Sequence, residues 1–459
     1  MSVEAEAAWR RAAEKVLKGA DFDAVLRHRR DDGLMIEPIY PRRRDTPPVV
    51  GRAPGMRWDI LQRLDHPDAA QANALAHAEL QGGADGITLV IADSPFARGY
   101  GLDGDALAQV LDGVHFQMVT LRLEAGESTP TLAQALGELA DRHGEAAPDL
   151  HFGFDPLGLL AAQGSLGEAL ADPAHAIAEL ARHLGETGHS GPVVAADSRV
   201  FHEGGATPVQ DLAILIANGV FYLRALEAAG LPLRAARSRI EFVLAADADI
   251  FMALARCRAL RLLWAQIEAH CGLEPAPLRL HVETSWRMLT RRDVWTNMLR
   301  AAGGILAAAL GGADSIGVLP VSEAHGLADA FARRSARNAQ QVLREEANLY
   351  RIGDPAAGAG GLEALTDTLC TKAWALFGEI ERRGGALAVL TSGWLQGLIA
   401  ENPPPEAVLV GTTKFLASEA ETVPVLDLAP RPRPAQRPAG LTAPAIERRR
   451  LAAGHDGRA

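Results

Sequence analysis

Cysteine is scarce in this chain: the 459 residues include three, Cys257, Cys271 and Cys370, and no two of them lie close together. An odd number without a C-x-x-C pair provides neither a disulfide framework nor zinc-type spacing. We therefore expect free thiols and no metal site. The N-terminus is charged and lacks the apolar core of a signal peptide, so the sequence predicts a cytoplasmic protein.

The sequence also lacks an excess of positive charge and long apolar runs. The formal net charge is −11, which disfavours a nucleic-acid binder because such proteins need a concentrated basic surface. No uncharged run approaches about 20 residues, so we expect no membrane-spanning helix. The hydrophobic share of 48% can nevertheless fill a large core. The composition predicts a folded protein that binds neither nucleic acid nor membrane.

Four common site motifs are missing from the sequence. There is no G-x-G-x-x-G after the first predicted strand and no phosphate-binding loop, which weakens the case for a Rossmann fold. There is also no G-x-S-x-G elbow or Cys–His arrangement for nucleophilic catalysis. Function must therefore be sought in the arrangement of the larger fold.

From Met56 onward, short apolar runs alternate with longer helical segments, and the unit repeats eight times. The apolar runs are Trp58–Leu61, Ile87–Ile91, Phe116–Leu121, His151–Phe154, Val193–Ala195, Ile240–Leu244, Leu280–Val282 and Ile316–Leu319. The clearest helical segments are Pro67–Gln81, Leu132–His143, His175–Leu184, Val209–Ala228, Asp249–His270 and Val294–Leu310. Such alternation produces parallel strands with right-handed crossovers, and eight units favour closure. The pattern predicts an α/β protein with a (β/α)8 TIM barrel.

The ends of the chain differ in composition from the predicted barrel. We expect residues 1–55 to form an N-terminal helix (Val3–Lys18) and an extended arm, 56–425 the barrel, and 426–459 a Pro/Arg-rich tail. Within the barrel region, the sequence predicts two extra helices and a strand, at Ala336–Tyr350, Leu362–Arg383 and Ala407–Val410. The tail cannot bury much apolar surface alone, so it should lie on another surface, with a short helix near Ile446–Ala453.

The reactive groups of such barrels follow the strands, at the C-terminal face. The residues at these positions are mostly acidic, and they are Asp93, Glu124, Asp155, Asp197, Asp247, Asp249, Glu283 and Glu323. His202 is the best candidate for acid–base chemistry because Asp197 and Glu203 are near it in sequence. A loop histidine bonded to backbone explains it equally well. Asp249 and Asp293 suit helix caps.

Three arginines, Arg256, Arg258 and Arg261, alternate with apolar residues on one predicted helix. Alternating charges on a helix usually mark a solvated or interface-facing side, and this is what we expect here. A basic grip on a phosphate-bearing ligand is the alternative.

Six stretches resemble the methylmalonyl-CoA mutase family, and they occur in the family's order between Asp31 and Val410. They are G-A-T-P-V-Q-D-L-A from Gly205, A-R-C-R-A-L-R-L-L-W-A from Ala255, H-V-E-T-S-W-R-M-L-T-R-R-D-V-W-T-N-M-L-R from His281, E-A-H-G-L from Glu323, A-R-N-A-Q from Ala336 and A-W-A-L-F-G-E-I-E-R-R-G-G from Ala373. The resemblance implies a (β/α)8 barrel that holds acyl-CoA along its axis, followed in catalytic chains by a cobalamin-binding domain.

The sequence departs from the catalytic members of this family at several places. The Asp-x-His-x-x-Gly motif of the cobalamin domain is missing, and Ser198-Arg199-Val200 stands where catalytic members have Gly-Tyr-His. D-P-L-G-L-L-A-A-Q-G from Asp155 replaces the segment whose arginine would grip the substrate carboxylate. The eighth strand ends in Gly317–Pro320 where the family has polar residues facing the cofactor.

We therefore expect no catalytic residue in this chain, with His202 as the one remaining candidate. The residues that the resemblance assigns to a remnant of the substrate pocket are Asp155, Asp197, Arg199, Glu283, Glu323, Arg337 and Asn338.

The resemblance implies the small, non-catalytic subunit of a heterodimeric, adenosylcobalamin-dependent methylmalonyl-CoA mutase, an isomerase of propionate metabolism. The large catalytic subunit would hold the cofactor, and the arm and tail of this chain would wrap that partner. One alternative is an active acyl-CoA mutase barrel that works with a separate cobalamin-binding protein. Another is a barrel that binds CoA esters without chemistry.

Overall fold

The computed structural model describes residues 3–30, 33–144, 149–401, 407–416, 422–432 and 439–455. Its main sheet consists of eight parallel strands, β3 (Asp59–Leu64), β4 (Gly86–Val90), β5 (Thr120–Glu124), β6 (Asp149–His151), β8 (Val194–Asp197), β9 (Ile240–Ala246), β10 (Arg279–Thr284) and β11 (Ser315–Gly317). The order is β6-β5-β4-β3-β11-β10-β9-β8. The two edges meet where Phe154 pairs in parallel with Val194. The predicted (β/α)8 barrel is confirmed, and every predicted apolar run overlaps a strand.

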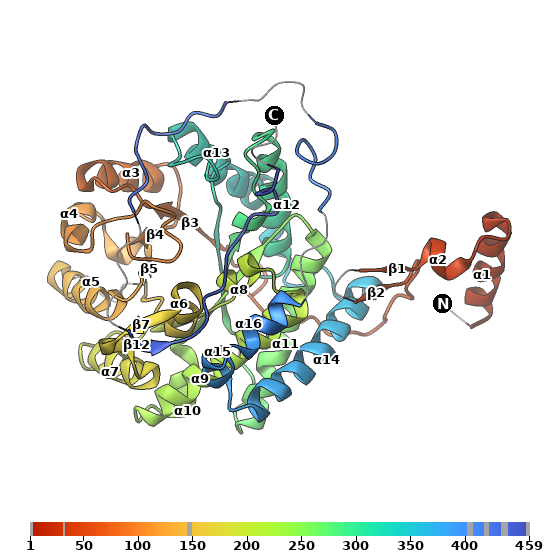
Figure 1. Ribbon diagram of the computed structural model, residues 1–459, viewed down its shortest axis with the longest axis horizontal. Coiled ribbons are helices and arrows are strands. Elements are labelled where there is room, and N and C mark those ends of the chain that lie inside the picture. Colours follow the sequence, from red (N-terminus) through yellow and green to blue (C-terminus); the bar gives the residue numbers. More distant parts are fainter. Residues whose placement is uncertain are drawn as a thin grey trace.

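The helices surround the sheet (Figure 1). The six clearest predictions are confirmed as α3 (Ala69–Gln81), α5 (Thr129–His143), α7 (Pro173–Glu186), α9 (Pro208–Ala228), α11 (Ile250–His270) and α12 (Thr296–Leu310). Among the described residues between β3 and β11, the sequence did not predict the short helices α4 (Leu107–Val110), α6 (Pro156–Gln163), α8 (Arg199–Gly204) and α10 (Leu233–Ser238). They are too short to show a clear helical period in the sequence.

An apolar layer fills the space between the strands and the helices. In it, Trp264 of α11 meets Phe242 of β9 edge-on, with ring centroids 4.7 Å apart. By length and mean hydropathy (1.3) α9 could cross a membrane, but 83% of its apolar window is buried inside the protein. Burial of this kind is what the core helix of a barrel shows.

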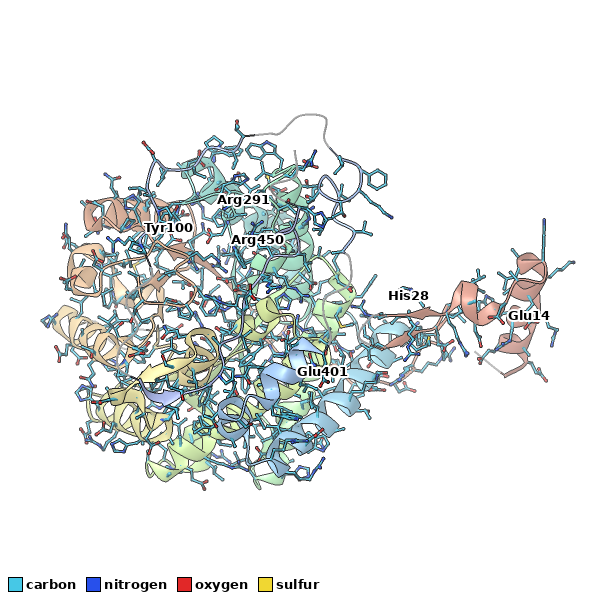
Figure 2. All side chains as sticks on the ribbon, in the orientation of Figure 1. Glu14, His28, Tyr100, Arg291, Glu401 and Arg450 are labelled. Atoms are coloured by element: carbon cyan, nitrogen blue, oxygen red, sulfur yellow. The ribbon has the colours of Figure 1, made fainter. Side chains whose placement is uncertain are left out.

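The N-terminal arm projects away from the barrel (Figure 1; Glu14 and His28 mark it in Figure 2). It consists of α1 (Val3–Leu17), α2 (Phe22–Leu26) and a short ribbon of β1 (His28–Arg29) and β2 (Met35–Ile36). The predicted helix is confirmed, whereas the ribbon was not predicted. Asp31, where the resemblance to the family begins, lies outside the described residues.

The C-terminal third of the chain corrects several predictions. The strand expected at Ala407–Val410 is wrong, because Val410 forms only an isolated bridge with Lys414. The helix expected at Ala336–Tyr350 is divided into α13 (Ala330–Gln341), a π-helical turn η5 (Val342–Glu346) and a 3-10 turn η6 (Leu349–Arg351). The second extra helix is confirmed as α14 (Gly360–Arg382), followed by α15 (Ala386–Thr391) and α16 (Trp394–Ala400).

The tail does not form the helix expected near Ile446–Ala453. Instead β12 (Ala439–Thr442) pairs antiparallel with β7 (Ser165–Gly167), and the chain then runs on extended to a turn at 451–455. Pro444 disfavours a helical conformation at the preceding residue, which explains the extended start. Residues 439–455 therefore lie on this chain's own barrel, where the sequence led us to expect contact with a partner.

Candidate functional site

The barrel lumen is lined by charged side chains. Arg122 on β5 donates from Nε to Glu241 on β9 at 2.9 Å, although β5 and β9 are not neighbours in the sheet. The contact therefore crosses the lumen. Arg122 and Glu124 alternate with Leu121 and Leu123, because successive side chains of a strand point to opposite faces. Lumens of such barrels are usually filled by Val, Ile and Leu, so this one is unusual.

A chain of five buried charges runs through the lumen. His151 Nδ1 lies 2.6 Å from Glu241 Oε1, and the same carboxylate accepts the bond from Arg122. Arg122 also donates to Glu124 at 2.7 Å, and Glu124 in turn accepts a bond of 2.5 Å from Arg199. Each of the five side chains is at most 6% exposed. Opposite charges alternate along the whole chain of contacts.

This alternation controls the pKa values. Burial alone would raise the pKa of Glu124, but Arg199 and Arg122 hold it far below its ordinary value. Glu241 behaves in the same way, with burial opposed by Arg122 and His151. Burial alone would lower the pKa of His151, but Glu241 and neighbouring acids raise it to about 9. The raised pKa favours the imidazolium form of His151 at neutral pH.

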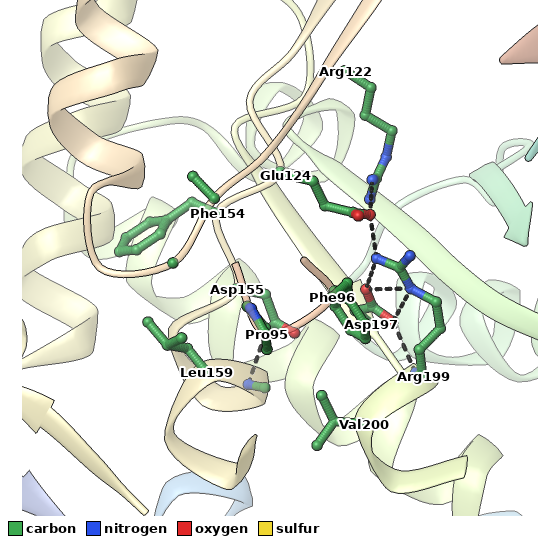
Figure 3. A pocket seen from close by; sticks show the side chains of 14 residues that line it. Pro95, Phe96, Arg122, Glu124, Phe154, Asp155, Leu159, Asp197, Arg199 and Val200 are labelled. Carbon is green, nitrogen blue, oxygen red and sulfur yellow. Dashed lines mark hydrogen bonds and ion pairs between the residues drawn. The ribbon is translucent and has the colours of Figure 1, made fainter. Parts of the chain in front are cut away.

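Arg199 is the centre of the barrel mouth (Figure 3). It lies at the start of α8, and its guanidinium binds Asp197 (2.9 and 2.6 Å) and Glu283 (3.0 Å) as well as Glu124. Its carbon Cζ lies 3.8 Å from the centre of the Phe96 ring. Burial would lower the pKa of Arg199, but the three carboxylates raise it well above its ordinary value. Each of the three nitrogens of this side chain therefore donates to a carboxylate of the protein itself.

A small cavity remains beside this cluster. Its volume is about 20 Å³, room for a single water molecule, and Glu124, Asp155, Asp197, Arg199 and Phe96 are among the residues that line it. Asp155 caps α6 by accepting from Gly158 N–H at 3.0 Å and also accepts a hydrogen bond from the Tyr222 hydroxyl. Burial raises the pKa of Asp155 to about 7, and the nearby Asp197 charge adds to the effect.

A second layer of ion pairs lies around the mouth. Arg63 donates to Asp65 at 2.7 Å, and Glu323 lies 3.8 Å from Arg63 and 3.7 Å from Arg98. Arg98 also donates to Glu203 at 2.9 Å. Burial raises the pKa of Glu323, although Arg63 and Arg98 oppose the shift. This layer joins the loops that follow β3, β4 and β11.

The predicted site residues divide into two groups. Asp155, Asp197, Arg199 and Glu283 come together at the mouth, and Glu323 lies in the layer around it. Arg337 and Asn338 do not join them. Arg337 pairs with Glu79 of α3 in the helical layer, and Asn338 is exposed.

His202 lies near the mouth on α8 but outside the set that lines the cavity. Its Nε2 is 2.8 Å from Ser285 Oγ, and its Nδ1 is 3.5 Å from Asp211. It is a buried helical residue bonded to side chains, so the interpretation as a loop histidine bonded to backbone is wrong.

Sequence reasoning missed Arg63, Arg122, His151 and Glu241 as residues of the lumen. A signal was available, because strands such as T-L-R-L-E and R-L-H-V-E-T alternate charged and apolar residues with period two. Alternation of this kind in a buried parallel strand indicates a polar inner face. It does not indicate which charges meet.

The prediction for the three arginines of α11 is corrected. Arg256 and Arg258 are each 2% exposed rather than solvated, and they bind Asp211 (2.6 Å) and Glu363 (2.9 Å) respectively. Arg261 is also buried and donates to the carbonyls of residues 278 and 312.

The predicted cap of α11 is confirmed, since Asp249 accepts from Met252 N–H at 3.2 Å. The cap expected from Asp293 is wrong, because α12 begins after Trp295 and no side chain caps it.

Together these features define a class, a (β/α)8 barrel whose polar lumen is closed by its own buried ion pairs. Residues 53–437 match the family model described as methylmalonyl-CoA mutase. The chain belongs to the methylmalonyl-CoA mutase family.

Curated relatives agree with this assignment. The methylmalonyl-CoA mutase small subunit of Streptomyces virginiae is 37% identical over 465 residues, which covers 94% of this chain and 73% of the relative. The probable small subunit of Mycobacterium tuberculosis is 32% identical, with 98% and 75% covered. The small subunit of Propionibacterium freudenreichii subsp. shermanii is 32% identical, with 84% and 63% covered.

The resemblance to catalytic members implies adenosylcobalamin, and the residues present do not fit that group. A corrin ring needs a broad open face, whereas the cavity at the mouth holds about one water molecule. In the described ranges, no group of three or more His, Cys, Asp or Glu side chains is placed to hold a metal ion. His151 and His202 are already engaged by Glu241 and Ser285. We therefore derive no catalytic step through this cofactor on this chain.

Proposed function

We propose that this chain is the small, structural subunit of a heterodimeric, adenosylcobalamin-dependent methylmalonyl-CoA mutase. A large catalytic subunit binds the cofactor and isomerises methylmalonyl-CoA to succinyl-CoA. The names of the relatives support the assignment to the small subunit. The observation that carries the non-catalytic part is Arg199, which ties Glu124, Asp197 and Glu283 together where the resemblance implies that acyl-CoA would lie.

Opening this lumen for a substrate would be costly. Removing one partner from a buried ion pair typically costs about 3–5 kcal/mol, because the remaining charge is left unsolvated. Entry of an acyl chain would have to separate several such pairs in series. The same pairs instead brace the barrel from within, which suits a chain whose role is to hold a partner in place.

Apolar groups at the surface support the existence of a partner. On the arm, Val16 is 78% and Val25 55% exposed, and α1 stands away from the barrel. An isolated 15-residue helix is marginal in water, so the arm gains stability by docking on another chain. On the barrel, Leu299 and Phe415 are 73% and 80% exposed. Exposed groups of this size often mark protein interfaces.

The remaining assignments are parts of the same proposal. In this proposal the arm (1–55) docks on the partner, the barrel (56–425) forms the main domain, and the tail (426–459) closes over the barrel. The complex is cytoplasmic, and CoA esters are handled by the large subunit. The remnant residues of the pocket serve structure in this chain.

Reconstitution tests the proposal. The large mutase chain from the same cell is purified alone and together with this chain, and turnover of methylmalonyl-CoA is measured with adenosylcobalamin added. We expect a stable complex and full activity only when both chains are present, and none from this chain alone. A large chain that is stable and fully active by itself would overturn the proposal. Turnover by this chain with a separate cobalamin-binding protein would establish the active-mutase alternative.

A further inference from the structure

An extended segment of the chain crosses its own barrel mouth. We call residues 439–455 the strap; it is the dark blue segment that runs over the barrel in Figure 1, and Arg450 marks it in Figure 2. After β12 pairs with β7, the strap continues to donate backbone hydrogen bonds. The Ala443 and Ile446 amides bind the carbonyls of residues 164 (3.0 Å) and 161 (2.7 Å). The Arg449 and Leu451 amides bind those of residues 203 (2.9 Å) and 287 (2.8 Å).

The side chains of the strap contact the ends of several barrel units. Arg448 lies 3.4 Å from Glu203 of α8 and 5.7 Å from the centre of the Phe96 ring. Arg450 lies 5.7 Å from the Trp286 ring and donates to the carbonyl of residue 289 at 3.1 Å. Apolar anchors hold the strap before and after these arginines, since Ile446 is 7% and Ala452 0% exposed.

Phe96 links the strap to the lumen. The same ring carries the Arg199 guanidinium at 3.8 Å and the Arg448 guanidinium at 5.7 Å. Phe96 is also one of the residues that line the small cavity. The strap thus lies directly outside the charged cluster, over the loop that follows β4.

Charge complementarity identifies the occupant of this surface. The strap carries the run E-R-R-R from Glu447, and Arg448 of this run lies 3.4 Å from the buried Glu203 at the mouth. Arg449 pairs with Glu447 within the strap itself. Cation–π contacts to Phe96 and Trp286 add aromatic partners for the same arginines.

We propose that the barrel mouth is a docking surface for an extended, arginine-bearing peptide, that its occupant is this chain's own strap, and that the strap separates the lumen ion pairs from water. The proposal does not depend on the presence of a large subunit. It also has a physical consequence, because ion pairs that are cut off from water interact more strongly and are screened less by salt. Segments with few buried anchors open locally without global unfolding, so the strap is expected to be detachable.

A glycine at the end of α8 allows the strap to be lifted without changing it. A Cβ added at Gly204 would overlap Ile446 Cγ2, so Gly204→Ala acts as a wedge beneath the strap in the full-length chain. Gly397→Ala is the matched control, because this glycine is also helical and nothing lies within 4 Å of the added Cβ. The double variant Gly204→Ala with Ile446→Ala removes the atom with which the wedge collides.

Hydrogen exchange at single amides is the measurement. In Gly204→Ala we expect exchange at the Ala443, Ile446, Arg449 and Leu451 amides to accelerate at least roughly tenfold, and trypsin to cleave faster at Arg448–Arg450. Gly397→Ala should match the parent chain. The double variant should exchange no faster than Ile446→Ala alone, which shows that the wedge acts through that one contact.

A buried amide shows whether the strap separates the lumen ion pairs from water. The Arg199 amide donates to Asp197 at 2.8 Å inside the cluster, and its exchange should accelerate together with that of the strap. Faster strap exchange with an unchanged Arg199 amide would overturn the sealing role. Unchanged strap exchange in Gly204→Ala would overturn the docking contact. If Gly204→Ala does not fold, Arg448→Glu provides the same test, because it places two carboxylates together at Glu203.

Discussion

The two faces of the barrel strands are both buried, but the outer face buries apolar side chains and the inner face buries paired charges. The outer face of β9 carries Phe242, which packs on Trp264, whereas the inner face carries Glu241, which binds Arg122 and His151. These residues are adjacent in sequence and equally buried. The outer contact is non-directional and tolerates change in pH, whereas the inner contact requires each charge to have its partner. The apolar contacts of the outer face stabilise the fold, and the ion pairs of the inner face determine whether a ligand can enter the lumen.

The largest expected effect is in the lumen. Arg199→Met leaves Glu124, Asp197 and Glu283 without their shared cation, so we expect the free energy of unfolding to fall by about 5 kcal/mol at pH 7. The loss should shrink as the pH falls towards 5, because the pKa of Glu124 rises without Arg199 and the acid can be neutralised. Chemical denaturation at both pH values measures this.

Arg199→Lys is the matched control for that variant. It keeps the charge but loses the planar fork that serves three carboxylates at once, so an intermediate loss is expected. A loss for Arg199→Met that is the same at pH 5 and 7 would contradict an electrostatic role for the cluster.

The apolar layer should respond to a similar deletion without any dependence on pH. Trp264→Ala removes a large buried ring and should cost about 4 kcal/mol, within the range found for buried aromatic residues. The value should be the same at pH 5 and 7 and at low and high salt. Phe415→Ala, at a side chain that is 80% exposed, should change stability by less than about 0.5 kcal/mol. A strong dependence on pH for Trp264→Ala would remove the contrast between the two faces.

Asp155 combines features of both faces, since it is buried, can ionise and lies near the like charge of Asp197. Its pKa of about 7 in the folded chain lies above the ordinary value of about 3.9, so the folded state holds the proton more tightly. Stability from this group is fully present below pH 4 and is lost as pH rises through 7. Asp155→Asn, which keeps an acceptor for Gly158 N–H, should flatten this fall and raise stability at pH 8 by about 1–3 kcal/mol. Parallel curves of stability against pH for the two proteins would contradict the assignment.

The smallest effect is expected on the arm. Glu14 pairs with Arg10 at 3.2 Å, but both side chains are about half exposed, so water screens the pair. Glu14→Gln should change stability by less than about 0.5 kcal/mol, and added salt should remove even that difference. A larger loss would show that the arm takes part in a charged contact beyond its own helix.

The sequence allowed the barrel to be predicted but not the closure of its lumen. Eight apolar runs separated by helical segments indicated the strands, and Asp249 was identified as a helix cap because local backbone geometry decides both. The pairing of Arg122 with Glu241 joins residues 119 positions apart, and no local pattern specifies it. Arg256 and Arg258 were misjudged for the same reason, since their partners Asp211 and Glu363 lie on other helices.

The period of two by itself divided the residues of each strand between two opposite faces, because alternate side chains of a strand point to opposite sides whatever the partner. The family motifs likewise determined the family. Only the tertiary structure decided that the charges facing the lumen neutralise one another and leave room for about one water molecule. It also decided that residues 439–455 cover the mouth. Both outcomes depend on contacts between segments far apart in the chain, whose geometry is set when the barrel closes.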